Sequence, residues 1–221
     1  MAWWVFAAVA AGPVRQTMTE SSALQDSPPL VLVHGLWDTP RLFDPLRRSL
    51  AGRREPLLVP HLPHGLGWTP LLELARGLDA AISNRFDAGT RLDLLGFSMG
   101  GLIARVWIQL LGGGQRTRRF ISIASPHQGS LVALPWPRRL LGGIADMKPG
   151  SALLSQLNAD IEPLQRIDCF SFYCQTDLTV VPGWKAVLPV GPRLALPARR
   201  HDRLMRDPAS LELVVRELLR P

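Results

Sequence analysis

The stretch 91–101 constrains this chain more than any other. A short apolar run, Leu92–Leu95, leads into Gly96-Phe97-Ser98-Met99-Gly100-Gly101, and an apolar run that suits a helix follows at once. This order predicts a strand, a tight turn with Ser98 at its apex, and a helix packed back on the strand. The first two glycines of the motif are needed because side chains there would collide with neighbouring backbone. We therefore expect the Ser98 hydroxyl to be exposed beside the Met99 amide, on strained backbone of the kind found at functional sites.

Apolar runs elsewhere alternate between two kinds. Runs typical of buried strands cover 30–35, 57–60, 120–124, 169–173 and 184–188, and runs typical of helices cover 46–50, 70–82 and 208–219. This alternation predicts βαβ units, a mostly parallel sheet and helices on both of its faces. In such sheets the chemistry gathers outside the carboxyl ends of the strands. The segment 131–165, rich in proline and glycine, is expected to be a small cap-like excursion.

Length and charge limit the classes of protein to consider. A chain of 221 residues suits one domain, expected over residues 28–221 behind a tail at 1–27. The net charge of +7 comes almost wholly from arginines that are scattered rather than massed. We therefore expect no nucleic-acid partner, whereas peripheral contact with anionic lipid or an acidic partner suits such a charge. The sequence leaves the oligomeric state open.

The N-terminus and the cysteines say little about the compartment. The first eleven residues are apolar, which is too short a run to span a bilayer. They have the length of a signal-peptide core, but no positive charge precedes them, and translation could instead start at Met18. Localisation stays open, with the cytoplasm slightly favoured over secretion. Cys169 and Cys174 would face opposite sides of one strand, so we expect two free thiols.

Ser98 needs a base within hydrogen-bond reach to become a nucleophile, and five histidines compete for that role. His34 ends a strand in a turn whose backbone is the better candidate for function. His61 and His64 flank prolines, and His127 lies in a Ser-Pro-His-Gln-Gly loop. His201 follows the last predicted strand and precedes the last helix, so its loop can bring the imidazole to the serine. The alternative is a solvated histidine in a basic loop.

The remaining groups of such a site can also be assigned. Asp177 follows a predicted strand and is the expected carboxylate partner of the histidine, although it could simply cap its own turn. Asp146, Asp160 and Asp168 are less well placed. The order Ser98, Asp177, His201 is the order expected of enzymes with a serine at a strand–turn–helix elbow. The oxyanion donors are expected to be the backbone amides of Met99 and Leu36. No metal site, phosphate-binding loop or cofactor is expected.

At this point a family resemblance is evident. It rests on five segments: His34-Gly35-Leu36-Trp37, Gly96–Gly101, Ser125-Pro126-His127-Gln128-Gly129-Ser130, Asp177-Leu178-Thr179-Val180-Val181-Pro182 and His201-Asp202-Arg203-Leu204-Met205. From about Leu30 to Pro221 the chain resembles the α/β-hydrolase superfamily, and within it the small bacterial triacylglycerol lipases and esterases. The resemblance implies the α/β-hydrolase fold, the same site residues, a structural role for His127 and a part in lipid metabolism.

These inferences lead to one functional hypothesis. The chain is expected to be a serine hydrolase that cleaves carboxylic esters, in particular acyl lipids, through an acyl-enzyme on Ser98. Apolar residues that would suit an acyl chain, or else pack in the core, are Trp37, Leu131, Leu134 and Trp136. Because fold and triad do not select the leaving group, a thioesterase, acyltransferase or lactonase is the alternative. A non-catalytic binding protein is a further one.

Overall fold

The computed structural model describes residues 27–137 and 141–221, so nearly all of the predicted N-terminal tail lies outside the described residues. Its centre is a six-stranded parallel sheet with the strand order β2-β1-β3-β4-β5-β6. The strands are β1 (Leu30–Val33), β2 (Leu57–Leu58), β3 (Leu92–Phe97), β4 (Thr117–Ile123), β5 (Asp168–Tyr173) and β6 (Arg193–Ala195). The parallel sheet predicted from the alternation of apolar runs is confirmed.

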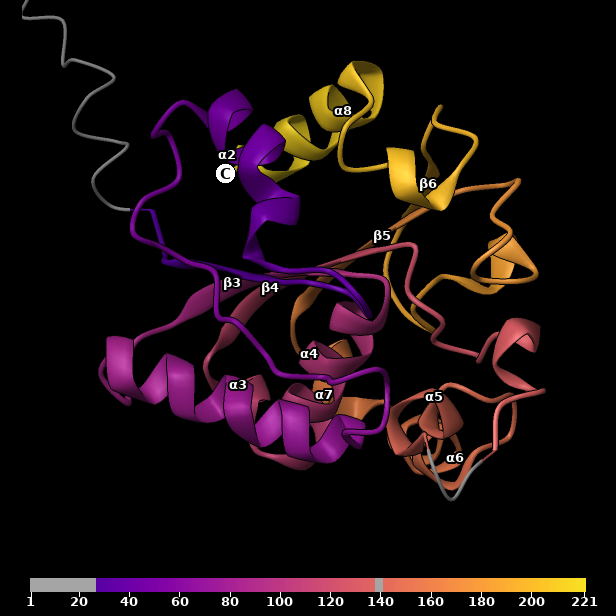
Figure 1. Cartoon of the computed structure of the whole chain (residues 1–221). Helices are drawn as coiled ribbons and strands as arrows, with labels where there is room; N and C mark the ends of the chain where they lie inside the picture. The colour runs from indigo at the N-terminus through magenta and orange to yellow at the C-terminus, as the bar shows by residue number, and fades with distance from the viewer. Residues whose placement is uncertain (1–26, 138–140) are drawn as a thin grey trace, which may run out of the picture.

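Helices cover both faces of the sheet (Figure 1). On one face lie α2 (Asp44–Leu50) and α8 (Pro208–Leu218), and on the other lie α3 (Leu71–Arg85) and α4 (Met99–Leu110). Strand β3 is buried along its whole length because its side chains alternate between the two cores. Leu94 packs with the core under α3 and α4, whereas Leu95 packs with the core under α2 and α8.

The segment 131–165 folds into short helices beside this layered body. These are η3 (Leu131–Ala133), α5 (Gly142–Asp146), α6 (Ala152–Ala159) and α7 (Glu162–Gln165). Leu154, Leu157 and Leu164 are buried in the core under α4, so α6 and α7 are integral parts of the domain. Residues 131–137 lie near the carboxyl ends of the strands (Figure 1).

One predicted strand is wrong. Residues 184–188 do not join the sheet: Gly183–Lys185 forms the 3-10 helix η4, and Ser171 Oγ accepts a hydrogen bond from the Leu188 amide at 2.9 Å. The amide of Leu188 therefore bonds to a side chain instead of a neighbouring strand. The sixth strand is β6, whose residues are mostly exposed, and Phe172 pairs with Leu194 in the register of β5 with β6. An exposed edge strand of three residues carries no apolar pattern that would reveal it.

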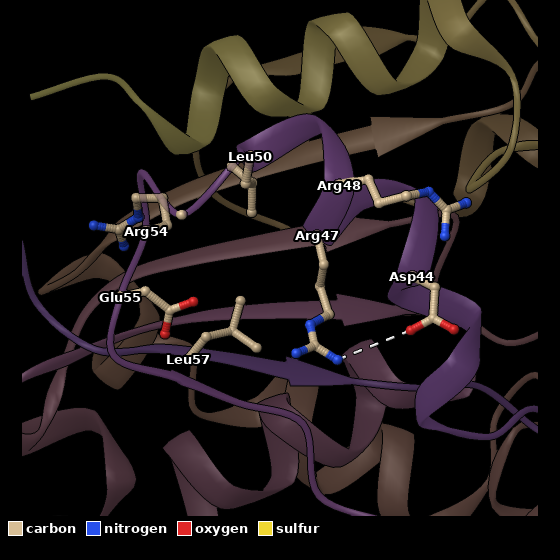
Figure 2. Close-up of a pocket in the computed structure, with 8 residues that line it drawn as sticks. Asp44, Arg47, Arg48, Leu50, Arg54, Glu55 and Leu57 are labelled. Atoms are coloured by element: carbon tan, nitrogen blue, oxygen red, sulfur yellow. Dashed lines mark ion pairs between the residues drawn. The ribbon is translucent and has the colours of Figure 1, made fainter.

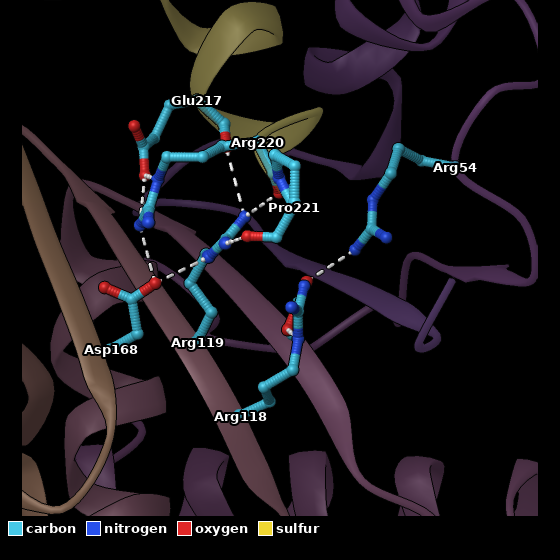
Figure 3. Close-up of polar contacts among 8 residues, drawn as sticks. Arg54, Arg118, Arg119, Asp168, Glu217, Arg220 and Pro221 are labelled. Atoms are coloured by element: carbon cyan, nitrogen blue, oxygen red, sulfur yellow. Dashed lines mark hydrogen bonds and ion pairs between the residues drawn. The ribbon is translucent and has the colours of Figure 1, made fainter. Parts of the chain in front are cut away.

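Ion pairs concentrate at the amino ends of β3, β4 and β5 (Figure 3). Asp93 accepts hydrogen bonds from Arg54 at 2.6 Å and from both Nε and Nη2 of Arg118 at 2.9 and 2.7 Å. Asp168 accepts hydrogen bonds from Arg119 at 2.9 Å and from Arg220 at 2.6 Å. We call this set of residues the amino-edge cluster.

Arg119 links the amino-edge cluster to the end of α8. Its guanidinium donates to the backbone carbonyls of Glu217, Arg220 and Pro221 at 3.2, 2.9 and 2.8 Å. Carbonyl groups at a helix C-terminus lack partners within the helix, and a cation there is favourable. The cluster therefore fastens α8 to the sheet.

Two smaller observations complete the fold. Cys169 and Cys174 are free and buried, and burial raises the pKa of the Cys169 thiol to about 12. Among the described residues, no helix is both long enough and apolar enough to span a membrane.

Candidate active site

Ser98 stands at the junction of β3 and α4, with φ of 52° and ψ of −126°. A positive φ is uncommon for a residue with a side chain, so the backbone here is strained. Ser98 is only 9% exposed, and it lines the cavity described below. The strand–turn–helix geometry predicted for this motif is present.

Close backbone contacts explain the glycines of the motif. A Cβ on Gly96 would lie 2.4 Å from the Gly101 Cα, and one on Gly100 would lie 2.1 Å from the carbonyl oxygen of Val33. Real Cβ atoms do not approach so closely, so any side chain would displace the turn from β3 or from β1. Because these two positions carry no side chain, the turn can pack closely enough to bring Ser98 to the end of β1.

His201 and Asp177 form a hydrogen-bonded pair. His201 Nδ1 lies 2.7 Å from Asp177 Oδ2, and the carboxylate is buried. Asp177 Oδ1 also accepts hydrogen bonds from the amides of Thr179 and Val180 at 2.7 and 2.9 Å. The carboxylate therefore both caps its own turn and orients the imidazole. With the proton on Nδ1, the Nε2 atom of His201 is left as an acceptor.

Ser98 and His201 line the same cavity, which has a volume of about 810 Å³. The ring of Phe97, the residue before the serine, lies 4.9 Å from the His201 ring. Within residues 27–137 and 141–221, no hydrogen bond joins the Ser98 hydroxyl to the imidazole. Hydrogen bonds between catalytic groups are often long in unliganded sites and shorten when the substrate binds.

The two backbone amides predicted as oxyanion donors belong to residues that lie close to Ser98. Met99 opens α4, so its N–H is one of the groups that a helix leaves without an intrahelical partner. Leu36 lines the cavity and lies in the turn that follows β1. Gly35 lies against the serine, because a Cβ on it would be 3.0 Å from Ser98 Cβ. The two amides predicted as oxyanion donors therefore flank the serine.

The cavity is largely apolar, and most of its apolar wall comes from four parts of the chain. These residues are Leu36, Trp37, Leu42, Phe97, Val132, Ala133, Trp136, Ile144, Met147, Leu178 and Val180. Of the residues predicted to contact an acyl chain, Trp37 and Trp136 line it, whereas Leu131 and Leu134 are exposed outside the lining. The reason is the geometry of η3, because residues three apart share one side of a 3-10 helix. Val132 and Ala133 face the cavity in their place.

Two of the other histidines are held in structural contacts. His34 Nε2 accepts the Leu62 amide at 3.2 Å while Nδ1 lies 3.1 Å from the Gly35 carbonyl, and burial lowers the pKa of His34. His127 is buried with its Nε2 2.7 Å from Ser122 Oγ, and burial together with the charge of Arg105 lowers its pKa well below the usual value. Both imidazoles are therefore neutral near pH 7.

A buried arginine and a serine support the loops around the cavity. Arg105 donates hydrogen bonds to the carbonyls of His127 at 3.3 Å and of Leu157 at 2.9 Å. Ser130 Oγ donates to the Thr179 carbonyl at 2.8 Å and accepts the Val181 amide at 3.2 Å. The loop that carries Asp177 is thus attached to the loop that begins the 131–165 segment.

Asp38 is a cavity residue that the sequence reasoning missed. It lies three residues after Gly35, in the turn that carries the Leu36 amide, and it lines the same cavity as Ser98 and His201. Burial raises the pKa of the Asp38 carboxyl, while the positive charges of His201, His64 and Arg206 oppose that rise. A carboxylate in a loop directly after a buried strand was a visible signal in the sequence.

A second depression, of about 340 Å³, lies beside α2 and β2 (Figure 2). Its lining includes Asp44, Arg47 and Glu55, and Asp44 faces Arg47 at 3.9 Å. It contains no histidine, cysteine or serine. The cavity around Ser98 is therefore the better candidate for chemistry. In the described part of the chain, no three histidine, cysteine, aspartate or glutamate side chains gather as metal ligands.

The parallel order of the sheet, the helices on both faces and the serine elbow define the α/β-hydrolase class of fold. The family model described as Alpha/beta hydrolase family matches residues 30–219, and the chain belongs to this family. No curated protein sequence matches the chain.

Solved structures of lipases and esterases resemble the chain at low sequence identity. The mature lipase BlEst2 of Bacillus licheniformis has a TM-score of 0.70 and 14% identity, with 87% of this chain and 92% of that chain covered. Aspergillus fumigatus lipase B has a TM-score of 0.70 and 15% identity, with coverage of 96% and 60%. A thermophilic esterase of Thermogutta terrifontis has a TM-score of 0.61 and 17% identity, with coverage of 87% and 89%. At these identities the likeness shows the fold.

Proposed function

We propose that the chain is a serine hydrolase that cleaves carboxylic esters, with Ser98 as nucleophile, His201 as base and Asp177 as its carboxylate partner. The observation that carries the proposal is the arrangement around one cavity. A strained serine elbow and an imidazole bound by a buried carboxylate line the same 810 Å³ space. The lipases and esterases that share the fold are consistent with this chemistry.

The reaction follows from these positions. His201 Nε2 takes the proton from Ser98 Oγ as the oxygen attacks the carbonyl carbon of the ester. The amides of Leu36 and Met99 stabilise the negative oxygen of the tetrahedral intermediate. The imidazolium, oriented by Asp177, then protonates the leaving alcohol, which departs and leaves an acyl-enzyme. Water, activated by the same imidazole, releases the acid and restores Ser98.

Acyl lipids are the substrate class that the cavity favours. Its wall is mainly apolar, and several apolar side chains at its rim are exposed to solvent: Trp37 is 62% exposed, Trp136 44% and Leu178 83%. Large exposed apolar groups gathered around a cavity suit an apolar ligand or a lipid surface. The surrounding arginines would add attraction to anionic lipid.

Labelling with a fluorophosphonate tests the nucleophile. The wild-type protein is expected to react at Ser98 and to hydrolyse p-nitrophenyl octanoate, whereas Ser98→Ala should take no label and lose about a millionfold in kcat. Ser155→Ala, an exposed serine on α6, is the matched control and should keep the label. Labelling of the Ser98→Ala protein, or an unlabelled but folded wild type, would overturn the proposal.

A further inference from the structure

Asp38 lies in the loop that follows β1 and lines the same cavity as Ser98 and His201. Asp38 Oδ2 lies 2.9 Å from the position that a Cβ on Gly35 would occupy, and Ser98 Cβ lies 3.0 Å from the same position. The carboxylate and the serine are therefore separated only by Gly35. Asp38 and His201 also line the same cavity, so the carboxylate shares this space with both groups that act on the ester.

The carboxylate has hydrogen-bonding capacity to spare. The other two acidic residues near the cavity are engaged, Asp177 by His201 and two amides and Asp202 by Arg200 at 3.0 Å. In the part of the chain that the structure describes, no side chain donates a hydrogen bond to the Asp38 carboxylate, and its one near donor is the backbone of Gly35. Polar groups that are partly buried lower their free energy by finding donors. Asp38 therefore offers acceptor atoms to a ligand in the cavity.

The distribution of polar residues indicates which part of an ester would meet Asp38. The wall supplied by Val132, Ala133, Trp136, Ile144 and Met147 is apolar and suits the acyl chain. The charged lining residues lie at Asp38 and at 200–206, around His201, whereas Ser130, Thr176 and Thr179 add only uncharged hydroxyl groups. Since His201 protonates the leaving oxygen in the proposed reaction, the leaving alcohol must lie on this polar side. Two arginines, Arg200 and Arg206, already line this side of the cavity, which favours a neutral donor over a further cation.

Resting on the proposed ester hydrolysis, we propose that Asp38 sets leaving-group specificity by accepting a hydrogen bond from a hydroxyl of the leaving alcohol. The preferred substrates are then esters of a polyhydroxy alcohol that keeps at least one free hydroxyl. A fully acylated polyol has no hydroxyl to donate, and an ester of a simple alkanol leaves the carboxylate unpaired when it fills this side of the cavity. Asp38 is thus a specificity residue that contacts the substrate.

A pair of matched esters tests this assignment. The monooctanoyl ester of glycerol at its terminal hydroxyl and propyl octanoate share the acyl group and a three-carbon alcohol, and they differ by two hydroxyls. The wild-type ratio of kcat/KM, glyceryl over propyl, should exceed ten. In Asp38→Leu that ratio should fall by about 10- to 100-fold, the effect of losing a hydrogen bond to a charged group. Asp38→Asn, which keeps one acceptor oxygen, should restore part of it.

Controls separate this inference from the proposed function. Asp44→Asn alters an exposed carboxylate on α2 that does not line this cavity, and it should leave the ratio as in the wild type. An equal fall in both esters for Asp38→Leu, or a wild-type ratio near one with p-nitrophenyl octanoate hydrolysed, overturns the specificity role alone. Failure of the wild type on all three esters, without fluorophosphonate labelling, overturns both.

Discussion

The two ends of the parallel strands, here called the amino edge and the carboxyl edge of the sheet, differ in how their charged groups are paired. At the amino edge, Asp93 and Asp168 are each held by two arginines, and Arg119 is also bound to backbone carbonyls (Figure 3). At the carboxyl edge, Asp38 lines the cavity, and no side chain of the described residues donates a hydrogen bond to its carboxylate. The Nε2 atom of His201 is likewise left as an acceptor. Charged groups whose hydrogen bonds are all made within the protein stabilise the fold, whereas groups that lack partners are available to bind ligands. The difference separates the structural edge from the candidate site.

The largest expected effect comes from Asp177, whose carboxylate binds His201 and two backbone amides. In Asp177→Asn the amide would favour the wrong tautomer of His201, so kcat on p-nitrophenyl octanoate should fall by about 10⁴ while the fold survives. Steady-state kinetics together with circular dichroism measure the two consequences separately. A rate within tenfold of the wild type would assign the carboxylate role to another residue.

Substitutions in the amino-edge cluster should change the stability of the protein and leave its catalytic rate unchanged. Asp93→Asn leaves Arg54 and Arg118 without their charged partner, and breaking a buried ion pair costs about 3–5 kcal/mol. Urea unfolding should show a lower midpoint with an unchanged slope. The kcat of the remaining folded enzyme should match that of the wild type.

Asp44→Asn is the control for this comparison, because its contact with Arg47 at 3.9 Å is exposed and should contribute less than about 1 kcal/mol. If Asp93→Asn and Asp44→Asn unfolded at the same urea concentration, the amino-edge cluster would not be the stabilising element inferred from its contacts.

The smallest effect should appear at Asp38, as a dependence of stability on pH. Because burial raises its pKa in the folded state, the folded protein binds more protons than the unfolded chain between the two pKa values. Stability therefore falls as pH rises through that window, and Asp38→Asn should become progressively more stable than the wild type. Thermal unfolding from pH 4 to pH 8 measures the difference.

Asp202 provides a control of opposite sign. The hydrogen bond and charge of Arg200 lower the pKa of the Asp202 carboxyl, so Asp202→Asn should lose stability relative to the wild type as pH rises. If the difference in stability between Asp38→Asn and the wild type did not change with pH, the pKa of Asp38 would not be raised in the folded protein.

The fold was largely predictable because it depends on apolar runs that are buried on both faces. Strands β1, β3, β4 and β5 were found in this way, and the serine elbow was found from its glycines. Strand β6 was missed because an edge strand of exposed residues carries no such pattern. The position of 184–188 was wrong because Leu188 bonds to a side chain across the fold, a contact that local sequence does not encode.

The candidate site was predictable for the residues whose backbone position follows from the topology. Ser98, Asp177 and His201 all follow strands at one edge of a parallel sheet, so chain order brings them near one another. The cavity wall was less predictable. Leu131 and Leu134 lie outside it because a 3-10 helix has a period of three, and the apolar composition of the segment does not reveal that period.

Gly35 has a consequence for redesign. A methyl group there would press on Asp38 from one side and on Ser98 from the other, at 2.9 and 3.0 Å. Residue 35 therefore lies between the two side chains, and under the roles proposed for Ser98 and Asp38 we expect its mutation to alter turnover and alcohol preference together. Engineers who want a new alcohol selectivity at undiminished speed should vary position 38 and keep the glycine.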